Sequence, residues 1–225
     1  MVIRREAPES VDALSGIVDV SRETSERLDV FVRLLEKWQR AQNLIAPSTL
    51  GFIWTRHVAD SAQICRLYPD ARTWIDLGSG GGFPGLVVGI LNADRPDFQM
   101  HLVEANSRKG AFLRTVIRET RIPGQVHVGR IEAYSPPQDR PVDVISARAL
   151  APLAELCGYA WPLMTEKTVA IFHKGRDWQR EVDLALHDWN LDLVVKDSAV
   201  DDGGKLIEIR ALQPIRKSHL NGVDE

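Results

Sequence analysis

The chain has 225 residues, of which 44% are hydrophobic, and its 28 Lys and Arg against 31 Asp and Glu give a formal net charge of −3. This charge weighs against indiscriminate nucleic-acid binding, although a local basic patch still allows RNA to be recognised. The sequence shows no apolar run long enough for a membrane span, no apolar segment typical of a signal peptide and no His or Cys spacing typical of a metal site. We therefore expect a cytoplasmic protein that binds neither a membrane nor a metal.

Sequence patterning divides the chain into an N-terminus that we expect to be partly flexible, a pair of helices, one α/β domain and a C-terminal tail. In chain order these parts are residues 1–20, 21–70, 71–212 and 213–225. The first helix begins near Ser21, where Ser21 or Thr24 is a candidate N-cap, and its apolar residues recur at helical spacing. The second helix is predicted over about Ser48–Tyr68.

From Thr73 onward, strand and helix patterns alternate, which predicts a largely parallel sheet with right-handed crossover connections. The seven expected strands lie near residues 73–77, 99–104, 125–129, 142–146, 168–173, 191–197 and 205–211. The last two are joined through Asp201–Gly204, which has the composition of a hairpin turn, so this final pair is predicted to be antiparallel.

The segment Thr73–Gly85, TWIDLGSGGGFPG, has the pattern of a strand, a tight glycine turn and a helix N-terminus. Glycine permits a left-handed backbone and a close approach by a ligand. Gly80, Gly82 and Gly85 satisfy the dinucleotide pattern GxGxxG, but a carboxylate at Asp76 would repel a pyrophosphate over the loop. The same carboxylate suits the positive sulfonium and ammonium groups of S-adenosylmethionine. We therefore favour a methyltransferase over a nicotinamide or flavin enzyme.

Two further strand ends support a nucleoside ligand. Glu104 ends the second strand, where an acid in α/β nucleotide folds accepts hydrogen bonds from ribose hydroxyls, and both candidate cofactors contain that ribose. After the third strand, Ile131 is placed to cover an adenine face and Glu132 to accept a proton from its amino group.

The end of the fourth strand, Ser146–Ala149, restricts the chemistry. It lacks the Asn/Asp-Pro-Pro-Tyr/Phe loop usual in amino-group methyltransferases, and Cys157 lacks the Pro-Cys context of carbon-5 pyrimidine methylation. The remaining target class is an atom that is already nucleophilic, such as guanine N7, for which alignment and desolvation suffice without a general base. Arg148, the candidate catalytic residue, would donate to guanine O6 or a phosphate, or would instead pair with a structural acid such as Asp143.

These residues together resemble the bacterial ribosomal RNA small subunit methyltransferase G family, also called RsmG or glucose-inhibited division protein B. The resemblance covers residues 25–211. Its motifs are Trp38 with Asn43-Leu44, Arg56-His57-x-x-Asp60-Ser61, Asp76-x-Gly78-x-Gly80-x-Gly82-x-Pro84-Gly85, Ser146-x-Arg148-Ala149 and Lys174-Gly175. One departure is Gly81, where a proline or alanine is common, and we expect it to loosen the loop without changing the ligand.

The resemblance implies an α/β class I S-adenosylmethionine-dependent methyltransferase. It implies a Rossmann-like, mostly parallel seven-stranded sheet with an antiparallel last pair and an N-terminal helical extension. It also implies methyl transfer to N7 of one guanine in a 16S ribosomal RNA loop near the decoding site, with low-level streptomycin resistance when the activity is lost. The cofactor contacts are then expected at Asp76, Gly78, Gly80, Gly82, Phe83, Glu104, Ile131, Glu132 and Arg148.

Basic residues cluster in the N-terminal helices and in the helix after the second strand, although any one of them can equally be a solvated surface charge. The candidate RNA-binding residues are Arg56, His57, Arg108, Lys109, Arg114 and Lys174. His57 with Asp60 is more simply explained as a packing or hydrogen-bonded pair. We expect a monomer whose partner is 16S ribosomal RNA or the small ribosomal subunit. The alternatives are a small-molecule methyltransferase, a nicotinamide-dependent oxidoreductase and an RNA-binding module without activity.

Overall fold

The structure is a computed structural model that describes residues 9–215 of the chain. The predictions for residues 1–8 and 216–225 lie outside the described residues. Within residues 9–20, which we expected to be flexible, Val11–Leu14 form a 3-10 turn (η1), and Leu14 is 1% exposed in the core. This part of the N-terminus is therefore packed against the rest of the protein. Over the described residues, no helix combines the length and the apolar character needed to cross a membrane.

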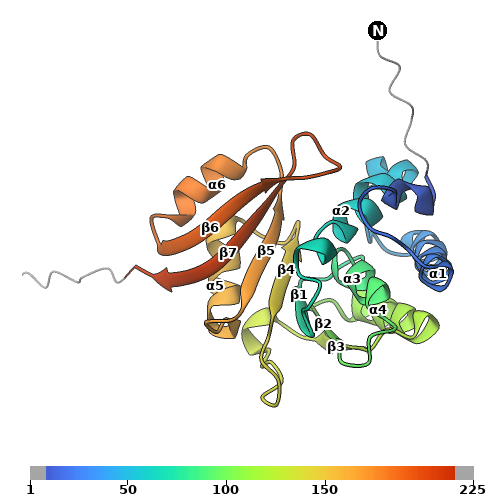
Figure 1. Ribbon diagram of the computed structural model, residues 1–225, viewed down its shortest axis with the longest axis horizontal. Coiled ribbons are helices and arrows are strands. Elements are labelled where there is room, and N and C mark those ends of the chain that lie inside the picture. Colours follow the sequence, from blue (N-terminus) through green and yellow to red (C-terminus); the bar gives the residue numbers. More distant parts are fainter. Residues whose placement is uncertain (1–8, 216–225) are drawn as a thin grey trace, which may run out of the picture.

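One seven-stranded sheet organises the described residues, with the strand order β3-β2-β1-β4-β5-β7-β6 (Figure 1). Its strands are β1 Thr73–Leu77, β2 Gln99–Glu104, β3 Gly124–Val128, β4 Val144–Arg148, β5 Val169–Lys174, β6 Trp189–Asp197 and β7 Lys205–Pro214. The first five pair in parallel, and β7 pairs antiparallel with both β5 and β6. This confirms the predicted mostly parallel sheet and its antiparallel final pair.

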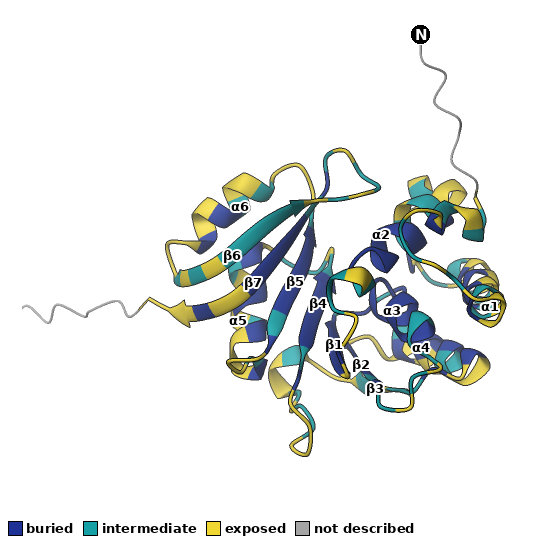
Figure 2. Ribbon diagram, viewed as in Figure 1, coloured by how far each residue is buried: buried dark blue, intermediate teal, exposed yellow. Residues whose placement is uncertain are grey.

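Helices cover both faces of the sheet (Figure 1). The helices are α1 Arg22–Gln39, α2 Ala59–Ala62, α3 Gly85–Leu91, α4 Ser107–Thr120, α5 Leu153–Ala160 and α6 Trp178–Ala185. Successive strand residues point to opposite faces, so Trp74 packs with α1, α3 and α4 while Ile75 and Leu77 pack with α5 and α6. Figure 2 shows the resulting buried band along the central strands, with the outer faces of the helices exposed.

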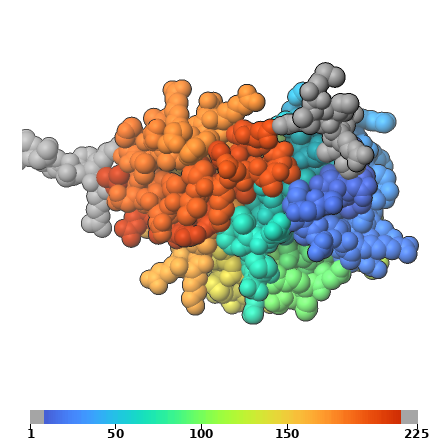
Figure 3. All heavy atoms as spheres, turned by 45° about the horizontal axis from the view of Figure 1, so that its top comes forward, coloured from blue at the N-terminus to red at the C-terminus, as the bar shows by residue number. Residues whose placement is uncertain are grey.

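The N-terminal segment forms an extra layer over α3 and α4. Helix α1 begins as predicted, because the Ser21 hydroxyl accepts a hydrogen bond from the backbone N–H of Thr24 at 3.1 Å. The segment after α1 meets the β6–β7 turn, since the backbone N–H of Ala199 donates to the Gln63 side chain at 2.8 Å. In Figure 3 these blue-to-cyan and red segments lie next to each other.

The predicted continuous helix over Ser48–Tyr68 is wrong. The segment instead forms a 3-10 helix η2 Pro47–Phe52, a π-helical turn η3 Trp54–Val58, the single turn α2, and a 3-10 turn η4 Cys65–Leu67. The Glu9 carboxylate accepts from the backbone N–H of Trp54 at 2.9 Å, where the 3-10 helix gives way to the π-helical turn. The Ser61 hydroxyl donates back to the carbonyl of His57 at 2.7 Å. Apolar spacing gave no sign of these polar breaks.

Helix α3 lies close beneath the glycine loop because its first residue has no side chain. A Cβ added at Gly85 would lie 2.4 Å from Leu102 Cδ2 and 2.7 Å from Asp76 Oδ2. Both distances are below any ordinary contact, so the strand and the helix would have to separate to admit even a methyl group.

We predict that Gly85→Ala destabilises the protein by about 1 to 3 kcal/mol, the usual cost of overpacking a core. Gly158→Ala is the matched control, because its Cβ would meet only Trp189 at an ordinary 3.8 Å in helix α5. That control should be neutral or stabilising by up to about 1 kcal/mol, since alanine favours helices over glycine. Urea denaturation measures both, and equal effects would contradict the packing argument.

Candidate functional site

A cavity of about 710 Å³ opens at the carboxyl ends of β1, β2 and β4. This volume falls within the range of small-molecule sites. Of the predicted cofactor residues, the cavity brings together Gly78, Gly80, Phe83, Glu104, Ile131, Glu132 and Arg148. Asp76 and Gly82 do not line it. The position at the ends of parallel strands is where ligands bind in open α/β sheets.

The loop between β1 and α3 depends on left-handed glycines. Gly78, Gly80 and Gly82 have φ values of 64°, 51° and 92°, which side chains rarely adopt. Gly82 lacks room as well, because a Cβ there would lie 2.3 Å from Leu86 Cδ1. Its contribution is therefore to the shape of the loop.

Glu104 connects the loop to the end of β2. Its Oε2 accepts from the backbone N–H of Gly80 at 2.8 Å, and its Oε1 accepts from the backbone N–H of Asn106 at 2.7 Å. Each carboxylate oxygen can accept a second hydrogen bond. The carboxylate can therefore hold the loop and still receive hydroxyl groups of a ligand in the cavity.

Asp76 lies beneath the loop, with no exposed surface. Its Oδ1 accepts from the Ser146 hydroxyl at 2.7 Å, and that hydroxyl accepts from Trp74 Nε1 at 2.9 Å. Its Oδ2 is buried and has no hydrogen-bond partner among the described residues. The structure therefore does not place Asp76 for the direct cofactor contact that we predicted, and any influence on a ligand acts through the loop.

Burial raises the pKa of Asp76 to about 7, against the opposing hydrogen bond from Ser146. The unfolded value is about 3.8, so the folded state binds more protons between these two values. The contribution of Asp76 to the free energy of unfolding therefore falls as the pH rises through this window.

His57 lies in the wall of the same cavity, although we predicted it as an RNA contact. Its ring packs against Phe83 with centroids 4.9 Å apart, and its Nε2 shares a hydrogen bond with the Thr49 hydroxyl at 2.8 Å. Burial, reinforced by the charge of Arg148, lowers the pKa of His57 to about 4. The imidazole is neutral at physiological pH and supplies no charge for a phosphate. The predicted pairing with Asp60 is not formed.

Part of the cavity wall comes from the segment 43–49 after α1, which we call the strap. Gln39 binds its backbone: Gln39 Oε1 accepts from the backbone N–H groups of Leu44 and Ile45 at 2.8 and 3.0 Å, and Gln39 Nε2 donates to the Ile45 carbonyl at 3.0 Å. A Cβ at Gly81 would lie 2.8 Å from the Leu44 carbonyl oxygen. Gly81 thus allows close contact with the strap, whereas we had expected it to loosen the loop. Sequence reasoning quoted Asn43-Leu44 as a motif but gave it no role.

Arg148, at the end of β4, is held by the N-terminal segment. Its Nε lies 3.3 Å from Asp60 Oδ2, and its Nη2 donates to the Arg56 carbonyl at 2.7 Å. Its Nη1 is buried without a hydrogen-bond partner among the described residues. The alternative pairing with Asp143 is wrong, because the Asp143 carboxylate instead accepts from the backbone N–H groups of Arg72 and Thr73.

The remaining candidate RNA residues differ in availability. Lys109 lines the cavity, and Arg108 and Arg114 are exposed on α4. Arg56 forms a half-exposed ion pair with Asp201 at 3.3 Å. Lys174 is only 7% exposed and pairs with Glu181 at 2.6 Å, so its ammonium is not free for a phosphate. No group of three or more His, Cys, Asp and Glu among residues 9–215 is placed to hold a metal ion.

The Arg148–Asp60 pair gives a prediction for stability. Their side chains are 19% and 11% exposed, and breaking a buried pair leaves one charge uncompensated. We expect Asp60→Asn to lower the free energy of unfolding by about 3 kcal/mol, the lower end for such pairs because Arg148 keeps its bond to a carbonyl.

The matched control is Glu26→Gln, which breaks the surface pair with Arg22, whose side chain is 87% exposed. It should cost no more than about 0.5 kcal/mol. Urea denaturation of both variants checks the comparison, and similar small losses would show that the Arg148 pair adds no net stability.

Comparison with known proteins agrees with this geometry. The family model described as rRNA small subunit methyltransferase G matches residues 24–208. A Ribosomal RNA small subunit methyltransferase G of Rhizobium johnstonii is 49% identical over 197 residues, which cover 86% of this chain and 95% of the relative. One from Parvibaculum lavamentivorans is 48% identical over 208 residues, covering 91% of this chain and 92% of the relative.

Solved structures with the same fold are distant in sequence. The O-methyltransferase TomG from Streptomyces achromogenes, solved in complex with SAM, has a TM-score of 0.56 at 15% identity, covering 87% of this chain and 92% of TomG. Cofactor-bound Rv0187 from MTB has a TM-score of 0.59 at 12% identity, covering 91% of this chain and 99% of Rv0187. These likenesses show the class I methyltransferase fold. Together with the family match and the relatives, they establish that the chain belongs to the rRNA small subunit methyltransferase G family.

Proposed function

We propose that this protein transfers a methyl group from S-adenosylmethionine to N7 of a guanine in 16S ribosomal RNA of the small subunit. The observation that carries the proposal is the cavity at the glycine loop, in a chain that belongs to a family of ribosomal RNA methyltransferases. The family's description names ribosomal RNA of the small subunit as the substrate. The target atom N7 and the absence of a catalytic base are further parts of our proposal.

The loop favours this cofactor over a dinucleotide. In a dinucleotide site the loop N–H groups bind a pyrophosphate. Here the backbone N–H of Gly80 already donates to the Glu104 carboxylate at 2.8 Å, and Asp76 is buried directly below. Both acids would repel a second anion, whereas they suit a ligand with positive charge. In this proposal Glu104 accepts from the ribose hydroxyls, and Phe83 and Ile131 make apolar contacts, which is supported by the position of all three in the cavity wall.

S-adenosylmethionine, when bound, supplies a methyl group on a positively charged sulfur. The protein's share is to bind and orient, since guanine N7 has a free lone pair and no proton to remove. A cysteine nucleophile is not available at the described site: Cys157 is fully buried in the core, and burial raises the pKa of its thiol to about 12. This supports an acceptor that is nucleophilic without covalent activation.

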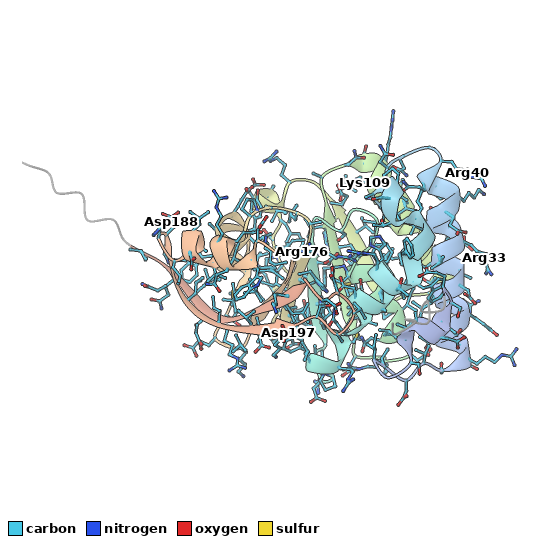
Figure 4. All side chains as sticks on the ribbon, turned by 90° about the horizontal axis from the view of Figure 1, so that it is seen from above. Arg33, Arg40, Lys109, Arg176, Asp188 and Asp197 are labelled. Atoms are coloured by element: carbon cyan, nitrogen blue, oxygen red, sulfur yellow. The ribbon has the colours of Figure 1, made fainter. Side chains whose placement is uncertain are left out.

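A basic surface beside the cavity supports an RNA substrate. Helices α1 and α4 pack side by side, and Figure 4 shows Arg33 and Arg40 extending outward from α1, with Lys109 near the start of α4. Among the described residues, no ion pair engages these three side chains or those of Arg108 and Arg114. Unpaired cations can contact phosphates and release counterions, which positions the RNA without reading its sequence.

The raised pKa of Asp76 predicts proton release on cofactor binding. With a pKa of about 7, part of this carboxyl is protonated in the free protein at a pH just below that value. A positively charged ligand above the loop favours the carboxylate and lowers its pKa, so binding should release protons. Calorimetry in two buffers of different ionisation enthalpy should then give different apparent binding enthalpies for S-adenosylmethionine.

Asp76→Asn should remove this buffer dependence while keeping the hydrogen bond from Ser146. S-adenosylhomocysteine, which lacks the sulfonium charge, should release fewer protons than S-adenosylmethionine. A wild-type enthalpy that is the same in both buffers would contradict the electrostatic role of Asp76.

The proposed function is tested by incubating the purified protein with labelled S-adenosylmethionine and small ribosomal subunits from a strain that lacks this gene. Borohydride–aniline treatment then cuts the RNA at 7-methylguanosine. We expect one cut, in the 16S RNA. Cofactor binding without transfer to subunits or naked RNA would favour a small-molecule methyltransferase, and an absence of cofactor binding would overturn the proposal altogether.

A further inference from the structure

A second cavity, of about 420 Å³, lies beside the first at the carboxyl ends of β4 and β5 and the β6–β7 turn. Arg148, Ala149 and Leu150 line both cavities. Ala149 has a φ of 52°, which is uncommon for a residue with a side chain and which turns the chain sharply at this wall. Leu150 packs so closely on the loop that a Cβ at Gly78 would lie 2.5 Å from Leu150 Cδ1. The two cavities adjoin along this short segment.

Charged side chains line part of the second cavity, and hydrogen bonds fix the orientation of one of them, Glu181. Glu181 Oε2 accepts from Lys174 Nζ at 2.6 Å and from the backbone N–H of Leu153 at 2.8 Å. No hydrogen bond from a described residue reaches its Oε1, so one carboxylate oxygen remains available as an acceptor. Arg148 lines both cavities and can contribute only donors, and its Nη1 has no hydrogen-bond partner among the described residues.

We propose that this second cavity receives the acceptor guanine, flipped out of the RNA, with its O6 toward Arg148, its N1–H and 2-amino groups toward the Glu181 carboxylate, and its N7 lone pair free of hydrogen bonds and directed at the first cavity. The inference rests on the proposed function, and it names the substrate site and a specificity-determining residue. A base must leave its stack to reach an enclosed site, and recognition then falls on its polar edges.

The arrangement of donors and acceptors selects guanine. Guanine offers an acceptor at O6 and donors at N1 and the 2-amino group, which match an arginine and a carboxylate, while N7 keeps its lone pair for the methyl group. Adenine would present an amino donor to Arg148 and an unprotonated N1 to Glu181, so both contacts would be lost. In this orientation N7 of guanine faces the first cavity, which shares Arg148, Ala149 and Leu150 with the second.

Filling the second cavity tests its role. Gly175 lines only this cavity, and a Cβ there would have no neighbour within 4 Å. Gly175→Leu should therefore fold normally, bind S-adenosylmethionine with unchanged affinity, and lose at least about 100-fold in methyl transfer to subunits. Gly129→Leu is the matched control, because that glycine also has no neighbour within 4 Å and lines neither cavity. The control should transfer at the wild-type rate.

The outcomes separate the two proposals. If the wild-type protein fails to methylate subunits, the proposed function fails. If the wild type is active and Gly175→Leu is equally active, or if Gly175→Leu weakens cofactor binding instead of transfer, only the second-cavity proposal fails. Thermal unfolding of each variant identifies a folding defect, and Ala151→Leu, which also lines only this cavity, replaces any variant that does not fold.

The base contact is tested by removing one partner at a time. RNA with inosine in place of the target guanosine lacks the 2-amino group, and the wild type should transfer to it roughly tenfold more slowly, the loss expected for one hydrogen bond to a charged group. In Glu181→Gln, transfer to guanosine should itself fall, and the inosine penalty should shrink below about twofold because the charged acceptor is absent. A full inosine penalty in Glu181→Gln would overturn the assignment of that residue.

Discussion

Asp60 is the residue at which four separate parts of the chain meet. Its carboxylate faces Arg148 at 3.3 Å and accepts hydrogen bonds from Gln63 at 2.7 Å and Ser198 at 3.2 Å, while its carbonyl bonds His173 Nε2 at 3.0 Å. The N-terminal segment, β4, β5 and the β6–β7 turn are thereby fixed relative to one another. Taking two charges out of water is expensive, and a buried pair is tolerated only where further hydrogen bonds satisfy it, as they do for this carboxylate. The N-terminal layer is thus part of the site's framework as well as a cover for the sheet.

The same burial that orders the site also controls its charges. Asp76 and His57 both lie against the glycine loop, and desolvation shifts the pKa of each so that its neutral form is favoured, upward for the acid and downward for the imidazole. The Glu104 carboxyl accepts hydrogen bonds from two backbone N–H groups. The cavity therefore combines an acid that is held in place by the backbone with an imidazole that is neutral at physiological pH.

The sequence predicted the mostly parallel sheet, its antiparallel last pair and seven of the residues that line the cavity, because strand ends and glycine turns leave local patterns. It failed where the controlling interaction was distant in the chain. The break near Trp54 depends on Glu9, and the position of Arg148 depends on Asp60, neither of which periodicity or spacing can report. Asp76 occupies the strand position that we predicted, but its direction toward Ser146 is set by packing between neighbouring strands. The burial of Lys174 beside Glu181 likewise depends on the docking of α6.

The strap over the first cavity is held by hydrogen bonds from two side chains outside it. Gln39, the last residue of α1, makes three hydrogen bonds to the strap backbone, and His57 shares one with the Thr49 hydroxyl. Local opening that breaks these bonds needs no unfolding of the sheet or of the helices beneath it. The exchange of spent cofactor for fresh can therefore depend on a few local bonds and can be set independently of the stability of the whole domain.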